Sequence, residues 1–382
     1  MFRRPRSGNA MEFLYGLLLI LGLVLLQRIL YEKLAFRRFE YRCEFSTKEA
    51  VEGEEISLVE TVTNAKILPL PWLRSELVTS RWLDYAGSQS LVTDDTRFVT
   101  SFFSMWGNRR TTRSWKVRCL KRGVFPVEKC VLLTTDLVGL MSTAFPAATD
   151  AELLVLPKPA DLTEVLSSAR TLSGDVLVRR HYLEDPFAVA GVRERTERDP
   201  INRIHWPATA RYGKLMVHNT LCTSDQNLLI LLNVQSRPAD AVDVDDPGRV
   251  EDCIRICAGY LEDTLRTGIP VRLAANAPSE GGMVVTEEFA GREHVLDLMR
   301  LLARLPMRVE EPFAALLDAA EEGLSASDIV LVTSFLSERM YDFARRMGER
   351  GVRVKLVCAV AADPTGIPED CDVLLLKEGG AA

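Results

Sequence analysis

Hydrophobic and polar positions divide the chain into three regions of different period. An apolar run without a break extends from Phe13 to Leu26 and, with few interruptions, to Tyr31. Over residues 41–145, apolar and polar residues alternate in short runs, as expected of half-buried strands. From residue 226 onwards, short apolar runs alternate with longer stretches of helical period. The pattern therefore predicts an N-terminal helix, a β-rich domain and an α/β domain.

The N-terminal apolar run is long enough to cross a membrane. About 20 apolar residues span a bilayer, and Arg28 can reach the headgroups from the end of such a helix. A signal peptide would also begin with basic residues, but the segment "QRILYEKLAF" contains no small-residue cleavage site. We therefore expect a basic segment over residues 1–10 and an uncleaved transmembrane anchor over residues 11–31. A buried helix of a soluble protein is the alternative.

Basic residues on both sides of this anchor indicate its orientation. Three arginines precede it, and five basic residues lie at its C-terminal end or after it, diluted by Glu32 and Glu40. The positive-inside rule, which counts basic residues near the span, favours a cytoplasmic position for the part that follows. Eight dispersed cysteines without a CxxC pair point to a reducing compartment, and they exclude a zinc ribbon or a thioredoxin-like site. We therefore expect a single-pass protein of the cell membrane whose soluble part is cytoplasmic.

Residues 40–160 read as an antiparallel β-sandwich. The segment "EGEEISLVETVTN" places Ile56, Leu58 and Val62 on one face, with Glu60 as the only break. Further short runs rich in Val, Phe, Trp and Thr are bounded by Gly, Asn, Asp or Pro. The segment "KILPLPWL" should be a loop or an edge strand, because its prolines cannot donate to a sheet. We find no catalytic constellation in this domain.

The region 226–382 reads as a doubly wound α/β domain, which follows a linker and motif segment over residues 161–225. "QNLLILLNV" is an apolar strand of the kind buried on both faces of a parallel sheet, and "GRVEDCIRICAGYLEDTLRTG" is an amphipathic helix closed by Gly268. Strands and helices then alternate to the end of the chain. Ligands of such sheets bind beyond the carboxyl ends of the strands, but no Gly-rich turn for a dinucleotide or a phosphate follows these strands.

The carboxyl ends of two of these strands resemble those of the von Willebrand factor A domain. That resemblance implies a Mg²⁺ site built from an Asp-x-Ser-x-Ser motif and from Thr and Asp residues of later loops. The matching residues here are mostly not metal ligands, and an arginine opposes any cation. We therefore expect a degenerate site without metal at Asn233, Gln235, Ser236, Arg237 and Ser334.

The segment "GVRERTERDPINRIHWPATARYGKLMV" is similar to the signature of a bacterial family called domain of unknown function 58. The matching positions are Gly191, Arg193, Glu194, Asp199, Arg203, Ile204, Trp206, Ala210, Arg211 and Leu215. The chain departs from the signature at Arg195 in place of Tyr, Arg198 in place of Gly and His205 in place of Asp. The resemblance implies a membrane anchor, a β-rich segment and a von Willebrand factor A-like domain. It also implies association with MoxR-type AAA ATPases and transglutaminase-like membrane proteins.

The charged residues of this segment suggest a structural clamp or a docking surface. Arg193, Arg203 and Arg211 can each hold a carboxylate such as that of Glu194 or Asp199. Trp206 offers an aromatic face on which an arginine can stack. His205, Asp199 and Arg211 could form an acid–base set, but no nucleophile lies in a recognisable motif.

We therefore expect a non-enzymatic interaction or scaffold protein without a cofactor, working with a MoxR-type ATPase in assembly at the cell envelope. The alternative is a divalent-metal-dependent binding protein or hydrolase that uses the carboxyl edge of the α/β sheet. The net charge of −6 and the pI near 5.5 argue against a nucleic-acid partner, because phosphate binding depends on clustered Lys and Arg.

Overall fold

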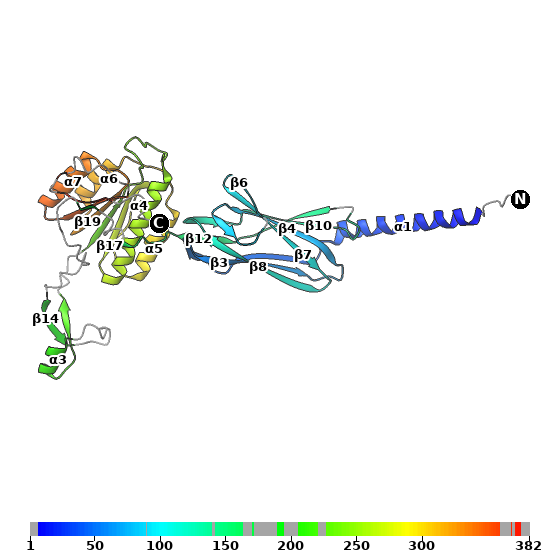
Figure 1. Cartoon of the computed structure of the whole chain (residues 1–382), viewed down its shortest axis with the longest axis horizontal. Helices are drawn as coiled ribbons and strands as arrows, with labels where there is room; N and C mark the ends of the chain where they lie inside the picture. The colour runs from blue at the N-terminus through cyan, green and yellow to red at the C-terminus, as the bar shows by residue number, and fades with distance from the viewer. Residues whose placement is uncertain are drawn as a thin grey trace. The chain divides into compact units, whose positions relative to one another are not determined.

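The computed structural model describes residues 7–88, 90–139, 142–162, 170–171, 189–194, 205–220, 227–359, 368 and 371–375. Contacts between residues divide the chain into two compact units, Met1–Pro157 and Lys158–Ala382. Figure 1 shows the helix α1 and a β-rich part in the first unit, and a sheet with helices in the second. The first unit ends three residues before the boundary expected at 160, and the segment 161–225 groups with the second unit.

The first helix, α1 (Ser7–Leu34), is long and apolar enough over Glu12–Leu34 to cross a membrane. It extends three residues beyond the predicted end because its last turns contact the β-rich part. Tyr31 is buried there, and its hydroxyl donates to the Pro69 carbonyl oxygen at 2.7 Å. The Gln27 amide donates to Asp136 at 2.7 Å. The end of α1 is thus attached to the loops that this part presents towards it.

The β-rich part contains two main antiparallel sheets. The first has the order β1-β3-β8-β5 and the second β11-β10-β4-β7-β6, while a small sheet has the order β2-β12-β9. The strands are β1 (Phe39–Phe45), β2 (Glu49–Val51), β3 (Glu55–Asn64), β4 (Leu70–Ser80), β5 (Leu83–Tyr85), β6 (Ser90–Thr93), β7 (Thr96–Met105), β8 (Arg109–Cys119), β9 (Gly123–Pro126), β10 (Lys129–Thr135), β11 (Ser142–Ala147) and β12 (Glu152–Leu156). Alternate residues of β3, β4 and β8 are buried in one shared core, as the period of two predicts. A β-sheet-rich domain is therefore present where the sequence predicts one.

The expectation that "KILPLPWL" is a loop or an edge strand is wrong for its second half. Pro71 lies near the start of β4, which pairs with β10 on one side and β7 on the other. The pairing with β7 passes from Leu70 to Leu73 through a register shift, and the pairing with β10 begins at Leu73. The missing N–H of Pro71 is therefore not needed by either neighbour, as at other bulges that contain proline.

A carboxylate lies in the middle of the β-rich core. Glu60 of β3 is fully buried, and four uncharged donors from four other strands surround it. Its Oε1 accepts from the hydroxyls of Tyr41 at 2.8 Å and Ser75 at 2.6 Å. Its Oε2 accepts from the Ser101 hydroxyl and, at 2.9 Å, from the Trp115 indole N–H. These bonds satisfy a group that would otherwise be costly to bury.

The second unit is built on a seven-stranded sheet of order β13-β21-β20-β19-β16-β17-β18. Its strands are β13 (Arg170–Thr171), β16 (Leu228–Leu232), β17 (Val271–Ser279), β18 (Gly282–Val285), β19 (Asp328–Thr333), β20 (Arg353–Cys358) and β21 (Asp372–Leu375). The five central strands are mutually parallel, and β13 and β18 pair antiparallel at the edges. The hairpin between β17 and β18, whose turn uses Gly281 and Gly282 at positive φ, was not expected from the sequence.

In the described part of this unit, four helices accompany the sheet: α4 (Pro247–Thr267), α5 (Arg292–Arg304), α6 (Phe313–Gly323) and α7 (Glu338–Glu349) (Figure 1). The helices α6 and α7 bury one face of the sheet, with Phe313 and Phe343 in a core with Leu229 and Leu331. The longest helix, α4, begins at a cap in which the Asp246 side chain accepts from the Arg249 N–H, and it ends at Gly268 in the left-handed conformation, as predicted.

Candidate functional site

The carboxyl ends of β16 and β19 lie next to each other and bring the predicted metal-site positions together. The two strands are parallel neighbours, and the loops that leave them contain Asn233 to Arg237 and Ser334. Asn233, Gln235, Ser236 and Ser334 are all buried there. The structure therefore places these residues together at one edge of the sheet. Their hydrogen bonds decide what the edge can do.

The two amide side chains at this edge are engaged with the protein itself. The Asn233 oxygen accepts from the Gln235 backbone N–H at 3.0 Å, and its amide N–H donates to the Thr333 hydroxyl at 3.0 Å. The Gln235 oxygen accepts from the Phe313 backbone N–H at 2.8 Å, and its amide N–H donates to the Asp240 carbonyl oxygen at 2.7 Å. Gln235 thus connects the loop after β16 to the first residue of α6.

Asp240 closes the same loop from inside. Its Oδ2 accepts from the Ser236 backbone N–H at 2.6 Å, the Ser236 hydroxyl at 2.7 Å and the Arg237 backbone N–H at 3.2 Å. Burial favours the neutral carboxyl, but these hydrogen bonds to the charged form outweigh it and hold the pKa of Asp240 below its usual value. The sequence analysis did not identify Asp240, although a Ser and an Asp four residues apart in a loop can bond in this way.

The serine hydroxyls at this edge are also occupied. The Ser236 oxygen accepts from the Asp246 backbone N–H at 3.0 Å, just before α4. The Ser334 hydroxyl lies 2.9 Å from the Gln235 carbonyl oxygen and 3.0 Å from that of Ser236, so its single proton is shared between them. The edge is a closed network in which β16, β19, α4 and α6 are joined.

These residues do not fit a divalent cation. Both amide oxygens already accept from backbone N–H groups, and the Ser236 hydroxyl donates to Asp240. The Arg237 guanidinium lies 3.4 Å from Asp245 and brings positive charge to the loop. A hard cation needs several free oxygens and negative charge. One oxygen, Oδ1 of Asp240, is buried without a hydrogen-bond partner. Among the described residues, no three His, Cys, Asp or Glu side chains gather as metal ligands would.

The signature segment forms a small module of two strands and a helix. The strands β14 (Val189–Glu194) and β15 (Met216–Thr220) pair antiparallel, with Arg193 opposite Val217 and Glu194 opposite Met216. The helix α3 (Trp206–Tyr212) precedes β15 and is joined to it. The Met216 N–H donates to the Thr209 hydroxyl at 3.0 Å. The predicted residues Asp199 and Arg203 lie outside the described residues.

His205 has a structural role at the start of α3. It is the N-cap residue, and its Nδ1 accepts from the Ala208 backbone N–H at 3.0 Å. The backbone N–H of His205 donates to the Met216 carbonyl oxygen at 2.7 Å. Aspartate is a preferred N-cap because its side chain accepts this bond, and an unprotonated imidazole nitrogen can do the same. The replacement of Asp by His therefore keeps the cap of α3.

Arg211, which the sequence suggests for a structural clamp or a docking surface, is not buried. Arg211 is exposed in the last turn of α3, and Trp206 at the first helical position is 64% exposed. Tyr212 and Leu215 are exposed beside them. The helix has only seven residues and buries Ala208, so it cannot enclose long side chains. We call Trp206, Arg211, Tyr212 and Leu215 the α3 surface.

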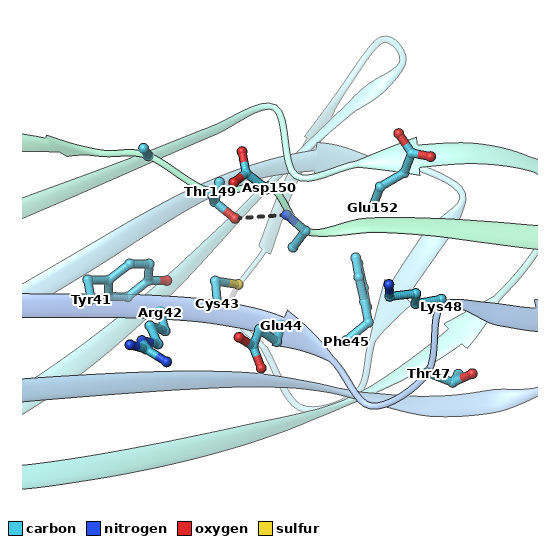
Figure 2. A pocket seen from close by; sticks show the side chains of 12 residues that line it. Tyr41, Arg42, Cys43, Glu44, Phe45, Thr47, Lys48, Thr149, Asp150 and Glu152 are labelled. Carbon is cyan, nitrogen blue, oxygen red and sulfur yellow. Dashed lines mark hydrogen bonds between the residues drawn. The ribbon is translucent and has the colours of Figure 1, made fainter.

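A groove that the sequence analysis did not predict lies along β1 in the first unit. Its volume is about 450 Å³, and Figure 2 shows Arg42, Glu44 and Lys48 on one side with Asp150 and Glu152 on the other. These charges of both signs face solvent, and Arg42 is paired with Glu40 at 2.7 Å. Burial and the charge of Glu60 raise the pKa of the Cys43 thiol to about 12, so this thiol is not a nucleophile at neutral pH.

Comparisons with known proteins identify a family for the second unit. The family described as "Protein of unknown function DUF58" matches residues 191–376. No curated protein matches the chain. Among solved structures, a non-cellulosomal cohesin from Archaeoglobus fulgidus is 14% identical and covers 31% of this chain and 91% of its own, with a TM-score of 0.22. A CARDB domain from Pyrococcus furiosus is 10% identical over 31% of this chain and 96% of its own, with a TM-score of 0.21. A type I cohesin from Pseudobacteroides cellulosolvens is 11% identical over 31% and 93%, with a TM-score of 0.22. At such scores these similarities say nothing about function.

Proposed function

The chain belongs to the DUF58 family, and from this premise we propose that it is a membrane-tethered, non-enzymatic interaction protein. Its partner in this proposal is a MoxR-type AAA ATPase, with a transglutaminase-like membrane protein as a further associate in assembly at the cell envelope. The helix α1 supplies the tether, and the soluble part lies in the cytoplasm. The second unit supplies the binding surface.

The observation that carries this proposal is the closed edge of the parallel sheet. In sheets of this type, ligands bind beyond the carboxyl ends of the strands. Here Asn233, Gln235 and Ser334 use their polar groups to bind the protein itself. A substrate or a metal ion would have to break these buried hydrogen bonds, at a cost of roughly 1–3 kcal/mol for each group left unpaired. The closed edge therefore favours a binding module over a hydrolase.

We further propose that the second unit is a von Willebrand factor A-like domain whose metal site has been replaced by this network. The central parallel strands and the position of the loops after β16 and β19 support this assignment. Asp240 takes the central place in the loop, because it binds the N–H groups of Ser236 and Arg237. Partner recognition by such a domain would not depend on a metal ion.

The α3 surface is the binding surface that the side chains favour. Trp, Tyr and Arg are the residue types that contribute most at protein interfaces, and the short helix exposes one of each around its axis, with Leu215 exposed after it. These side chains do not pack against the rest of the module, since Ala208 is the one residue of α3 that is buried. A large apolar side chain that is 64% exposed on a seven-residue helix is available to a partner.

Binding of the full chain, reconstituted in nanodiscs, to the purified MoxR-type ATPase tests this proposal. We expect binding in the presence of EDTA and no gain from Mg²⁺. Trp206→Ala should weaken binding at least about 30-fold, which corresponds to the loss of one hot-spot residue of about 2 kcal/mol. Arg211→Ala should weaken binding while changing the midpoint of thermal unfolding little, because exposed residues contribute within about 0.5 kcal/mol to stability.

Leu265→Ala and Arg266→Ala serve as matched controls, since both residues are exposed on α4 of the same unit. They should bind like the parent. Equal binding by the Trp206→Ala variant would remove the α3 surface from the proposal. Binding that requires Mg²⁺, or a midpoint that rises with Mg²⁺, would instead favour the metal-dependent alternative.

A further inference from the structure

Apolar side chains are exposed on three loops of the β-rich part, all at the end where α1 joins it. Ile67 of the β3–β4 loop is 85% exposed, and Trp106 of the β7–β8 turn is 73% exposed. Leu137 and Val138 of the β10–β11 loop are 55% and 56% exposed. Single exposed apolar residues are ordinary, but neighbouring loops that expose them together indicate an interaction surface. We call Ile67, Trp106, Leu137 and Val138 the apolar tip.

Hydrogen bonds and close contacts place these loops together. The Asn64 amide donates to the carbonyl oxygens of Leu68 at 2.9 Å and Trp106 at 3.2 Å, which joins the first two loops. A Cβ atom at Gly107 would overlap the backbone of Ile67, so glycine is what lets the β7–β8 turn approach this closely. The third loop begins after Thr135, which pairs with Ser142 at the same end of the sheet.

The loops are also attached to a defined level of α1. Tyr31 binds the backbone of Pro69, two residues from Ile67, and Gln27 binds Asp136, the residue before Leu137. The apolar tip therefore lies near residues 27–31 of the helix. Whatever surrounds α1 at that level also surrounds the tip.

The length of α1 determines what surrounds it there. The unbroken apolar run Phe13–Leu26 has 14 residues and is preceded by Glu12. At 1.5 Å per residue it spans about 21 Å, which is about 9 Å less than the roughly 30 Å of a hydrocarbon core. The expected anchor over residues 11–31 and the apolar span Glu12–Leu34 both make up this length with residues after Leu26, which places Gln27 to Tyr31 in the membrane or at its interface. These include the residues to which the loops are attached.

Given the membrane tether proposed above, we infer that the apolar tip inserts into the lipid interface around α1, on the side where the β-rich part lies. Trp side chains are enriched at this depth because the ring is apolar and its N–H is polar. The charges at this end suit anionic headgroups. Basic residues there are Arg28, Lys33, Arg37, Arg38, Lys66, Arg109 and Arg110, against Glu32, Glu40 and Asp136. Insertion would fix the β-rich part at the membrane surface instead of leaving it on a free tether.

Tryptophan quenching by brominated lipid tests this inference. The full chain is reconstituted into vesicles of phosphatidylcholine and phosphatidylglycerol with or without bromine on the acyl chains. We expect the brominated vesicles to quench part of the tryptophan emission. Trp106→Phe should reduce that quenching, because Trp106 is the tryptophan of the apolar tip, and Trp72, which is also exposed near this end, accounts for what remains. Phenylalanine keeps the apolar surface, and the exposed position tolerates the change.

Trp206→Phe is the matched control, because Trp206 is similarly exposed but belongs to the second unit. Its removal should not lower the quenched fraction of the emission. Equal quenching in the parent and the Trp106→Phe variant would overturn the inference while leaving the tether intact. Flotation of the vesicles after an alkaline wash tests the tether separately. A chain that does not float with the vesicles would refute the tether of the proposed function, and with it the insertion.

Discussion

Replacement of Glu60 tests how the core of the β-rich part is held together. Glu60→Leu would leave the hydroxyls of Tyr41, Ser75 and Ser101 without their acceptor. An unsatisfied buried donor costs about 1–3 kcal/mol, and part of that cost is offset because a carboxylate is no longer buried. We expect a net loss of about 3 kcal/mol in the free energy of unfolding of this part.

Glu60→Gln should be much milder because of the donors around it. The Trp115 indole can only donate, and it donates both to Oε2 and, at 3.1 Å, to the Ser101 hydroxyl, so the glutamine oxygen keeps the first of these bonds if it takes the place of Oε2. The amide N–H₂ then faces the hydroxyls of Tyr41 and Ser75, which can rotate and accept. Each of the four contacts can therefore be kept. We expect this variant to lose less than about 1.5 kcal/mol.

Urea unfolding of the full chain measures both variants in a Trp206→Phe background. The other four tryptophans all lie in the first unit, so their emission then reports this unit alone. If the Glu60→Gln and Glu60→Leu variants lose the same free energy of unfolding, the hydroxyls of Tyr41 and Ser75 do not change from donors to acceptors. If Leu costs nothing, the four hydrogen bonds only compensate for the burial of the charge.

Two further predictions concern the buried thiols of the β-rich part and the cap of α3. Burial raises the pKa of three core thiols above the value of 9.0 in an unfolded chain, to about 12 for Cys43 and about 11 for Cys119 and Cys130. Between pH 9 and 11 the unfolded chain therefore loses protons that the folded chain keeps, and stability should fall as pH rises, by up to about 1.4 kcal/mol per pH unit for each thiol. Urea unfolding over this range checks the slope, and alanine at all three positions should make it less steep, while other buried thiols and tyrosines with raised pKa values keep part of it. At the start of α3, His205→Ala should weaken the helix by about 1 kcal/mol and His205→Asp should not, because only the alanine variant loses the cap. Hydrogen exchange of the Ala208 amide measures both, and equal protection in the two variants would refute the cap.

The sequence predicted the architecture where local periodicity is strong. The alternation in β3 identified the buried positions Ile56, Leu58 and Val62, and the apolar run of β16 identified a strand buried on both faces. Pro71 wrongly indicated a loop or an edge strand, because the register shift in β4 is a property of the strand pairing and not of the local sequence. Glu60 was read as a break in the pattern. Its donors come from other strands, and the nearest in sequence, Ser75, is 15 residues away.

The candidate sites show the same limit. The metal-site positions could be located because they follow two apolar strands that are neighbours in a parallel sheet. The sequence could not show that Asp240 binds the loop from inside, because that depends on the loop conformation. For Arg211, the charges of the segment suggested a clamp. Whether the Arg211 side chain is buried decides between a clamp and a docking surface, and the seven-residue helix α3 is too short to bury it.

The polarity of the loop after β16 explains how the fold can keep this edge ordered without a cation. A metal ion would order the loop by attracting oxygen atoms from several residues. Asp240 does the opposite, because its carboxylate attracts the N–H groups of Ser236 and Arg237 and the hydroxyl proton of Ser236. These donors point towards a negative charge, and a cation in the same place would meet them instead of lone pairs. A metal site could therefore not be restored by exchanging Asn233, Gln235 and Arg237 for better ligands, since the loop would also have to release Asp240 and turn its backbone. The network is an alternative way to hold the edge, and under the proposed function recognition would fall to surfaces elsewhere on the unit.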